Sequence, residues 1–156
     1  MLFRSKTTTA INVATALVAV GQKVLLIDLD PQGNACTGLG IPHSKRKVGT
    51  YEVILGAIPI AEAVVATEIP GLDVVPSTVD LAGAELDLVT MDRRVQRLRD
   101  AVSSVAQKYD HVLIDCPPSL GLLTVNAMVA ADALLVPLQC EFYALEGLSH
   151  LLKTID

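Results

Sequence analysis

The sequence predicts an α/β fold in which a mostly parallel sheet carries helices on both faces. Hydrophobic residues make up 51% of the 156 residues, whereas aromatic residues make up only 3% and tryptophan is absent. A core of Val, Leu, Ile and Ala is typical of parallel strands that are buried on both sides. In addition, short apolar runs alternate along the chain with segments of helical periodicity, which is the pattern of consecutive βα units.

The first two elements follow from patterns near the N-terminus. Apolar residues recur at helical spacing over 8–20, and Gly21 after them suits a left-handed helix cap. The run 23–29 (KVLLIDL) is typical of a buried strand, and Pro31 and Gly33 close it. The chain therefore opens with a helix and a strand.

The later elements are predicted from the same two periods. A Gly- and Pro-punctuated segment over 34–70 leaves room only for short helices. We expect short helices at Thr50–Leu55 and 60–66, strands at 72–76, 111–116 and 133–138, a long helical region at 79–108, and helices at 120–131 and 146–155. In the long helical region one apolar stripe recurs every three to four residues: Met91, Val95, Leu98, Val102 and Val105.

The charge of the chain excludes a strongly basic protein. Twelve Lys and Arg against 17 Asp and Glu give a formal net charge of −5, so no net positive charge drives nucleic-acid binding. The arginines over 93–99 alternate with Asp92 and Asp100, which favours a solvated helix face over a nucleic-acid patch.

The cysteines and histidines do not form a recognisable site. Their spacing predicts neither a disulfide framework nor a zinc site, and a reducing compartment is the default. These residues are Cys36, Cys116, Cys140, His43, His111 and His150.

The N-terminus has two interpretations. A basic start before the apolar stretch 10–20 resembles a secretory signal. Threonines and Asn12 interrupt that apolar character, and the helical spacing favours a helix of a βα fold. No stretch of 18 residues is fully apolar, so no membrane span is predicted and a cytoplasmic location is expected.

A phosphate-binding motif is indicated where the first helix opens. Lys6 is followed there by Thr7, Thr8 and Thr9. The unpaired N–H groups of a helix start favour phosphate, a lysine adds a point charge, and a neighbouring hydroxyl can bind Mg²⁺. On its own the motif is weak, because a threonine-capped helix start has the same residues.

Carboxylates follow two of the predicted strands. Asp28 and Asp30 share a face at the end of the run 23–29, close to a metal or a water, although an Asx turn at the strand end is an alternative. Asp115 ends the apolar run 112–114 as a Walker B carboxylate does. Ligands of α/β sheets bind at the carboxyl ends of strands. The three corners, which are the start of the first helix at Lys6 and the strand ends at Asp28 and Asp115, therefore together indicate a nucleoside triphosphate with Mg²⁺.

From Lys6 onward the chain resembles the ParA/Soj chromosome- and plasmid-partitioning ATPases, which are relatives of MinD with a deviant Walker A motif. The resemblance rests on KTTTAINVATALVAVGQKVLLIDLDPQGNACTGLG, on YDHVLIDCPPSLGLLTVNAMVAADALLVPLQCEFYALEG and on the spacing between them. It implies a P-loop NTPase fold with ATP and Mg²⁺ as ligands.

The resemblance also implies roles for individual residues. Lys6 would contact the β- and γ-phosphates and take part in catalysis, and Thr8 would be a further phosphate contact. Asp30 would position or activate the hydrolytic water. The metal would be bound by Thr7 and Asp115, with support from Asp28, and the region from Pro117 to Asn126 would sense the γ-phosphate.

The family implies partners as well. ATP promotes a homodimer that binds DNA non-specifically through a C-terminal surface, and a ParB-like activator stimulates hydrolysis. No membrane partner is expected, and the location would be cytoplasmic and nucleoid-associated.

The chain departs from the family at its start. The family motif, Lys-Gly-Gly-Val-Gly-Lys-Thr-Thr, follows a strand, whereas Met1-Leu2-Phe3-Arg4-Ser5 precedes Lys6 here. A loop that wraps phosphate needs the positive φ and close approach that glycine permits. Residues 1–156 are therefore expected to be a single, partial ParA-type nucleotide-binding domain without the first strand, the P-loop glycines and the C-terminal part. Either the start lies inside the P-loop through an artefact of start choice, or the chain is a degenerate paralogue.

Three functions remain open from sequence. The first is a partitioning ATPase, with weak or absent turnover expected for this chain. The second is a non-catalytic fragment that docks on a full-length relative through apolar edges. The third is a MinD-like ATPase, which would require a C-terminal amphipathic helix; DLDPQGN and LQCEFYALEG look more like ParA/Soj.

Overall fold

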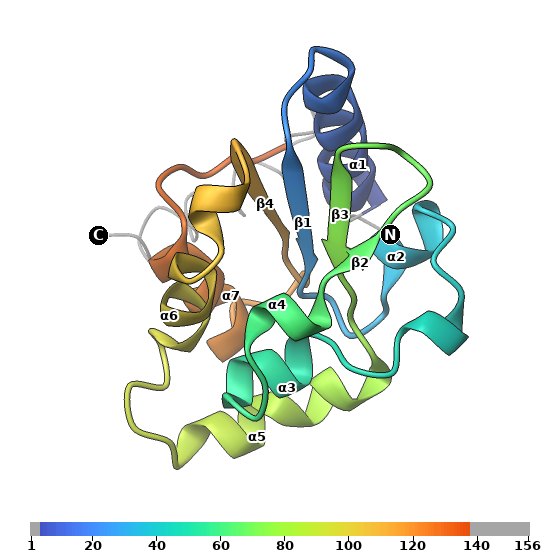
Figure 1. Ribbon diagram of the computed structural model, residues 1–156. Helices are drawn as coiled ribbons and strands as arrows, with labels where there is room; N and C mark the ends of the chain where they lie inside the picture. The colour runs from blue at the N-terminus through green and yellow to red at the C-terminus, as the bar shows by residue number, and fades with distance from the viewer. Residues whose placement is uncertain (1–3, 138–156) are drawn as a thin grey trace.

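The structure, a computed structural model, describes residues 4–137 and confirms the α/β fold (Figure 1). Its four-stranded sheet has the order β2-β3-β1-β4. β1 (Val24–Asp28) runs parallel to β3 (Leu72–Val75) on one side and to β4 (His111–Asp115) on the other. The two-residue strand β2 (Val65–Ala66) pairs antiparallel with β3, so the sheet is mixed but mostly parallel.

Helices cover both faces of this sheet. Leu25 and Ile27 of β1 lie in one core cluster, whereas the alternate residues Val24 and Leu26 lie in a second cluster on the opposite face. The second cluster is covered by α1 (Arg4–Ala19) and α2 (Asn34–Gly38), and the first by α3 (Thr50–Leu55), α4 (Ile60–Ala63), α5 (Ala84–Val89), α6 (Arg97–Ser103) and α7 (Leu122–Ala130). Three short 3₁₀ helices complete the described part: η1 (His43–Lys45), η2 (Val79–Gly83) and η3 (Ala106–Lys108).

Most predicted elements are present with small shifts of their ends. α3 has the predicted bounds, and the predicted strands 23–29, 72–76 and 111–116 correspond to β1, β3 and β4. The first helix begins at Arg4 rather than at position 8, so Lys6 and Thr7 lie in its first turn.

The predicted helix 60–66 is too long. α4 ends at Ala63, Val64 takes extended backbone angles, and the next two residues form β2 beside β3. Pairing with an existing strand therefore outweighs the helical pattern there, which agrees with the preference of β-branched valines for strands.

The predicted long helical region 79–108 is interrupted. It consists of η2, α5, a turn over 90–96, α6 and η3, and Arg93 in the turn has a positive φ of 54°. The apolar stripe still faces the core, since Leu98 and Val105 are buried and Met91 and Val102 pack against the same cluster.

The predicted strand 133–138 is wrong over the residues that are described. Residues 133–137 form no regular element, and Leu134, Leu135 and Val136 are exposed by 47%, 70% and 39%. A strand needs a ladder partner, and within residues 4–137 β4 pairs only with β1, so its other edge has no strand. The predicted helix 146–155 lies outside the described residues, as do Cys140 and His150.

Among residues 4–137, no helix combines the length and the hydropathy that a bilayer crossing requires. Cys36 and Cys116 are free thiols, as the cysteine spacing predicts.

Candidate nucleotide site

The sheet brings the predicted phosphate and metal residues together at one edge. Asp28 and Asp115 are the last residues of β1 and β4, and they are register partners in the parallel ladder. Lys6 and Thr7, at the start of α1, reach this edge, because the Lys6 ammonium group donates a hydrogen bond to the Pro117 carbonyl at 3.0 Å. The three corners that the sequence singles out therefore meet at the carboxyl ends of two neighbouring strands.

Asp115 carries an unsatisfied oxygen. Its carboxylate is 2% exposed and accepts a hydrogen bond from the Thr7 hydroxyl, whereas its Oδ2 has no hydrogen-bond partner within the described residues. The pKa of Asp115 is raised to about 6, chiefly by burial; Asp28 and Asp30 contribute to the rise, whereas the Thr7 hydrogen bond and Lys6 oppose it. A buried carboxylate with a spare oxygen is incomplete without a cation or a donor.

These residues fit a magnesium ion bound together with a phosphate. Within the described residues no group of three His, Cys, Asp or Glu side chains forms a ready cage for a metal. Mg²⁺ does not need one, since it is usually held by one or two protein oxygens plus phosphate oxygens and waters. Asp115 Oδ2 and the Thr7 hydroxyl are suitable oxygens.

Asp28 is built into the loop that follows β1. It is fully buried, and its two carboxylate oxygens accept hydrogen bonds from the backbone N–H groups of Asp30, at 3.2 Å, and Cys36, at 3.0 Å. Burial raises the pKa of Asp28 against the effect of these bonds. Asp28 thus joins the end of β1 to α2. Its predicted support for a metal would act from this position.

Asp30 forms an Asx turn, which is the alternative that its spacing leaves open. Its Oδ1 accepts a hydrogen bond from the Gln32 N–H at 2.9 Å, and its carbonyl accepts one from the Gly33 N–H at 2.8 Å. Gly33 has φ of 61°, a conformation that glycine adopts without strain. The turn fixes one carboxylate oxygen of Asp30, whose side chain remains 8% exposed.

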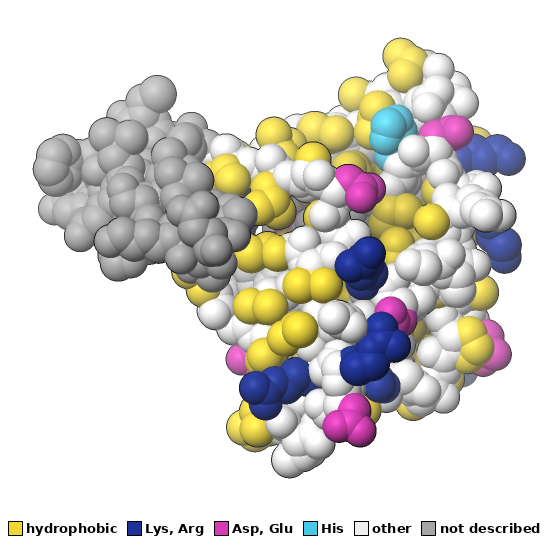
Figure 2. All heavy atoms as spheres, turned by 90° about the vertical axis from the view of Figure 1, so that its left-hand side faces the viewer, with side chains coloured by type: hydrophobic (Ala, Val, Ile, Leu, Met, Phe, Trp, Pro, Cys, Tyr) yellow, Lys and Arg dark blue, Asp and Glu magenta, His cyan; other side chains and the backbone are white. Residues whose placement is uncertain are grey.

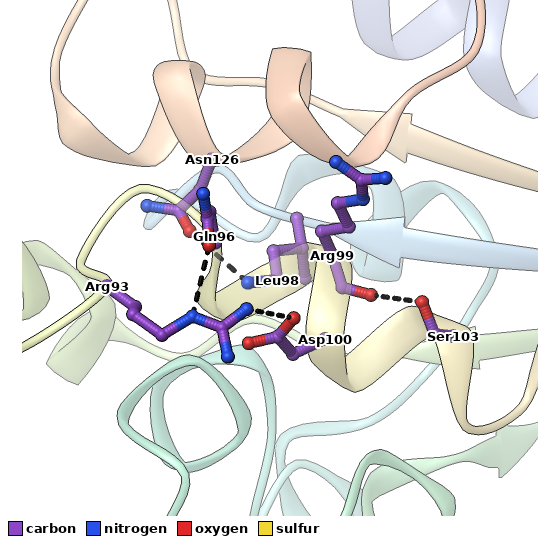
Figure 3. A network of polar contacts seen from close by, with 7 residues as sticks. All are labelled: Arg93, Gln96, Leu98, Arg99, Asp100, Ser103 and Asn126. Atoms are coloured by element: carbon purple, nitrogen blue, oxygen red, sulfur yellow. Dashed lines mark hydrogen bonds and ion pairs between the residues drawn. The ribbon is translucent and has the colours of Figure 1, made fainter.

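Asn126 is engaged in a different contact. Its Oδ1 accepts a hydrogen bond from the Leu98 N–H at 3.2 Å (Figure 3). Its side-chain amide donates to the carbonyls of Arg94, at 2.8 Å, and Leu122, at 3.0 Å. These bonds join α7 to the start of α6 and to the turn before it. The structure therefore brings Lys6, Thr7 and Asp115 together, whereas Asn126 binds groups of α6, of α7 and of the turn before α6. The role of Asn126 at a nucleotide stays a prediction.

Pro117 and Thr8 flank the site. Pro117 is buried and offers its carbonyl to Lys6, whereas Thr8 is exposed and lies directly after the first turn of α1. Both are placed where a phosphate contact is possible, and both roles stay predictions.

Two contacts at the start of α7 were missed at the level of sequence. Glu85 of α5 accepts a hydrogen bond from the Leu123 N–H at 3.4 Å, and Thr124 donates to the Ser119 carbonyl at 2.6 Å. Together they hold the segment between β4 and α7. The first joins residues 38 positions apart, so no local pattern could reveal it.

Arg93, Arg94 and Arg99 lie on an exposed face, whereas Arg97 is half-buried and donates hydrogen bonds to the Ile54 and Leu55 carbonyls of α3. Arg93 pairs with Asp100 at 3.0 Å, with both side chains about half exposed or more (Figure 3). Figure 2 shows the same mixture of Lys and Arg with Asp and Glu on the face turned to the viewer. This agrees with the predicted solvated face.

Comparison with known proteins identifies the family. Residues 4–156 match the AAA_31 family, described as an AAA domain. The chain is 58% identical over 153 residues to the chromosome partitioning protein ParA of Caulobacter vibrioides, and 49% identical over 150 residues to the sporulation initiation inhibitor protein Soj of Bacillus subtilis. The chain belongs to the ParA/Soj family. These alignments cover 97% and 96% of the chain but 57% and 59% of the relatives, so the chain spans less than two thirds of their length.

A solved structure agrees with this fold. It is described as cobyrinic acid a,c-diamide synthase from Mycobacterium smegmatis with bound ATP analogue and magnesium, and it matches with a TM-score of 0.92 and 43% identity. The match covers 97% of the ParA/Soj-family chain and 62% of that protein.

Proposed function

We propose that residues 1–156 form part of the nucleotide-binding domain of a partitioning ATPase, with ATP and Mg²⁺ as its ligands. The observation that carries the proposal is the buried, unpartnered Oδ2 of Asp115 beside the Thr7 hydroxyl, at the start of α1. The names of the relatives, ParA and Soj, and the ATP analogue and magnesium in the similar structure support it.

Four residues would hold the ligands. Lys6 would place its ammonium group on the β- and γ-phosphates, while the first-turn N–H groups of α1 favour the same anion. Thr7 and Asp115 would hold Mg²⁺, which when bound neutralises charge on the phosphate oxygens. Thr8 would add a hydroxyl to the phosphates.

Asp30 would act on the hydrolytic water. The Asx turn leaves its second oxygen, Oδ2, available, and the loop places the carboxylate near Asp115, whose pKa Asp30 raises. A water held by this oxygen would attack the γ-phosphorus. The new bond joins the water oxygen to phosphorus, the bond to the β–γ bridging oxygen breaks, and Asp30 accepts the proton.

The segment from Pro117 to Asn126 would report the state of the nucleotide. Lys6 contacts its first residue through the Pro117 carbonyl, and Asn126 joins its end to α6. A phosphate that draws the ammonium group away from this carbonyl would therefore release the start of the segment while its end stays attached.

The remaining steps would involve partners of the whole protein. ATP-dependent homodimerisation, non-specific DNA binding and stimulation by a ParB-like activator are the family's cycle, in a cytoplasmic, nucleoid-associated setting. The DNA-binding surface would lie in the part of the relatives that this chain does not span.

Nucleotide binding tests the proposal directly. ATP would be titrated calorimetrically into the chain with Mg²⁺ or with EDTA. We expect Lys6→Ala to weaken binding at least about tenfold, as befits the loss of a charge-assisted contact, and Asp115→Asn to remove the Mg²⁺ dependence. Lys23→Ala, at an exposed lysine, is the matched control and should leave binding unchanged. Binding that tolerates Lys6→Ala would contradict the proposal.

Turnover needs a separate measurement, because the residues before Lys6 lack the family glycines. We expect slow phosphate release at saturating MgATP and its loss in Asp30→Ala. Robust hydrolysis that survives Asp30→Ala would contradict the role given to this residue.

The open edge of β4 favours a second candidate function, docking onto a full-length relative. Within residues 4–137 this edge has no strand, and Leu134 and Leu135 beside the end of the described chain are exposed. Sedimentation of the chain alone and with a full-length relative would decide. Complex formation supports docking, and a stable monomer in both cases contradicts it.

A further inference from the structure

A cavity lies beside the turn that follows β1, towards β3 and away from the nucleotide site. It has a volume of about 200 Å³ and is lined by the turn after β1, by η1 and the residue after it, and by the segment that follows β3. The lining residues used below are Gln32, Gly33, Arg46, Thr78 and Asp80. The nucleotide site lies at the ends of β1 and β4, whereas this cavity is lined by segments that follow β1 and β3; in the sheet, β3 and β4 lie on opposite sides of β1 (Figure 1).

Arg46 brings a buried positive charge to this cavity. Arg46 is buried and only 8% exposed. Its hydrogen bonds go to neutral acceptors only: the Ile41 carbonyl at 3.0 and 2.6 Å, the Thr37 hydroxyl at 3.2 Å and the Gly33 carbonyl at 3.5 Å. No carboxylate within residues 4–137 forms an ion pair with it. A buried guanidinium without a counter-charge is unfavourable, so an anion would be stabilised beside it.

One edge of the guanidinium group is under-used. Nη1 carries two N–H donors, and its single contact, to the Gly33 carbonyl, is at the 3.5 Å limit of a hydrogen bond. A Cβ at Gly33 would lie 3.0 Å from Nη1, so glycine at this position also keeps the approach to the guanidinium open.

Thr78 lines the same cavity and carries a second donor group. Its Oγ1 is buried and has no hydrogen-bond partner among the described residues. Buried hydroxyl groups are nearly always paired, so an unpaired one indicates a ligand or water. Because Arg46 and Thr78 line one small cavity, one small ligand with several acceptor atoms can satisfy both.

We propose that this cavity binds a phosphate-type oxyanion, through Arg46 Nη1 and the Thr78 hydroxyl. A tetrahedral oxyanion offers several acceptors, and guanidinium groups bind phosphate through paired, charge-assisted hydrogen bonds. The anion is either inorganic phosphate or the phosphate group of a nucleotide. Asp80 at the rim opposes an anion by its charge, so its removal strengthens binding.

The cavity is lined in part by the turn that holds Asp30. Gln32 and Gly33 line it, and their N–H groups are the donors that hold Asp30 in its Asx turn. An anion in the cavity stiffens this turn. This consequence rests on the proposed role of Asp30, whereas binding of the anion itself does not.

Titration of inorganic phosphate into the full chain, followed by ¹H–¹⁵N NMR at constant ionic strength, tests the proposal. We expect saturable shifts at the amides of Gly33 and Thr78. Thr78→Val, which keeps the side-chain shape, should weaken binding about three- to tenfold, as for a lost hydrogen bond, without lowering the Tm. Asp80→Asn should tighten it. Arg46→Lys should abolish it, and thermal unfolding shows whether that variant is folded.

Lys6→Ala separates this site from the nucleotide site. Phosphate shifts at Gly33 and Thr78 that persist in Lys6→Ala support the cavity, even if ATP binding proves absent. Competition with ADP in this variant identifies the source: displacement of phosphate indicates a nucleotide phosphate group, and its absence indicates free phosphate. No saturable shift, shifts that Thr78→Val leaves unchanged, or shifts that Lys6→Ala abolishes would overturn the proposal.

Discussion

Glu85, on α5, places its carboxylate where a Cβ on Gly121 would lie, at the start of α7. Its Oε1 accepts a hydrogen bond from the Leu123 N–H at 3.4 Å. The first N–H groups of a helix have no acceptor within the helix, and a carboxylate also suits the positive end of the helix dipole. Glycine at position 121 therefore lets a residue of α5 cap α7, directly after the segment that begins at Pro117.

This fit predicts a non-additive pair of substitutions. Glu85→Ala should lower the free energy of unfolding by about 0.5–2 kcal/mol, as for a lost helix cap. Gly121→Ala should lower it by about the same amount, because the extended backbone of Gly121 accepts alanine without strain but the new Cβ displaces the flexible Glu85 carboxylate and with it the cap. In the double variant the clash is absent, so its loss should be smaller than the sum by at least about 0.5 kcal/mol. Urea unfolding of the parent, the two single variants and the double variant gives the four free energies. Additive losses would contradict the contact between Glu85 and Gly121.

Asn126 is expected to be a major source of stability for the α6–α7 contact. Asn126→Ala leaves the buried Leu98 N–H and the half-buried Arg94 carbonyl without their partner, which should cost about 2–4 kcal/mol. Asn12→Ala, at an exposed position of α1, is the matched control and should change stability by less than about 0.5 kcal/mol. The measurement is chemical unfolding followed by circular dichroism. A loss below about 1 kcal/mol for Asn126→Ala would show that the turn before α6 forms without it.

The same residue explains where sequence reasoning stops. The strands are predictable because each is a short apolar run with a turn signal after it, and the parallel arrangement then places Asp28 beside Asp115. The interruption of the 79–108 region is not predictable in this way. The turn over 90–96 contains neither Gly nor Pro, and its partner, Asn126, is 28 and 32 residues away from the groups that it binds. Helical periodicity in a short window cannot report such a contact.

The candidate site shows the same division. Residue types and positions in the chain placed Lys6, Thr7 and Asp115 at one edge of the sheet, and the structure brings them together. The Asp30 turn and the Glu85 cap depend on geometry that a residue pattern leaves open. The exposed residues 133–137 fail as a predicted strand because an apolar run specifies a strand only when a neighbouring strand is there to pair with it.

Asp115 predicts a pH-dependent stability. Burial raises its pKa from an ordinary 3.8 to about 6 in the folded chain. Between those values the folded state retains a proton that the unfolded state has released, so the contribution of Asp115 falls as the pH rises and is constant above about pH 6. Asp115→Asn removes this cost. In EDTA, the variant should be more stable than the parent by up to about 3 kcal/mol at pH 7.5, and the difference should vanish towards pH 4.

The control for this prediction is another carboxyl group. Asp132 is exposed, so Asp132→Asn should change the free energy of unfolding by less than about 0.5 kcal/mol at every pH measured. Urea unfolding at pH 4.5, 6 and 7.5 gives the comparison. An Asp115→Asn variant that is less stable than the parent at pH 7.5 would show that its hydrogen bond with Thr7 outweighs the cost of burying the charge.

Gly49 and Gly83 should respond in opposite directions to the same substitution. At Gly49 the φ of −165° is ordinary, but a Cβ would lie 2.0 Å from the carbonyl oxygen of Pro76 and would collide with it. The Thr50 N–H donates a hydrogen bond of 2.9 Å to the same oxygen. Backbone on both sides leaves no flexible side chain to move aside. Gly49→Ala should therefore separate the start of α3 from the end of β3 and cost about 2–4 kcal/mol.

At Gly83 a Cβ would meet nothing within 4 Å, and the backbone is already helical, with φ of −80°. Gly83→Ala restricts the unfolded chain without a clash, so it should raise the free energy of unfolding by about 0.4–1 kcal/mol. Thermal and urea unfolding of the two variants tests steric exclusion against chain entropy. A loss of stability for Gly83→Ala, or none for Gly49→Ala, would contradict this explanation.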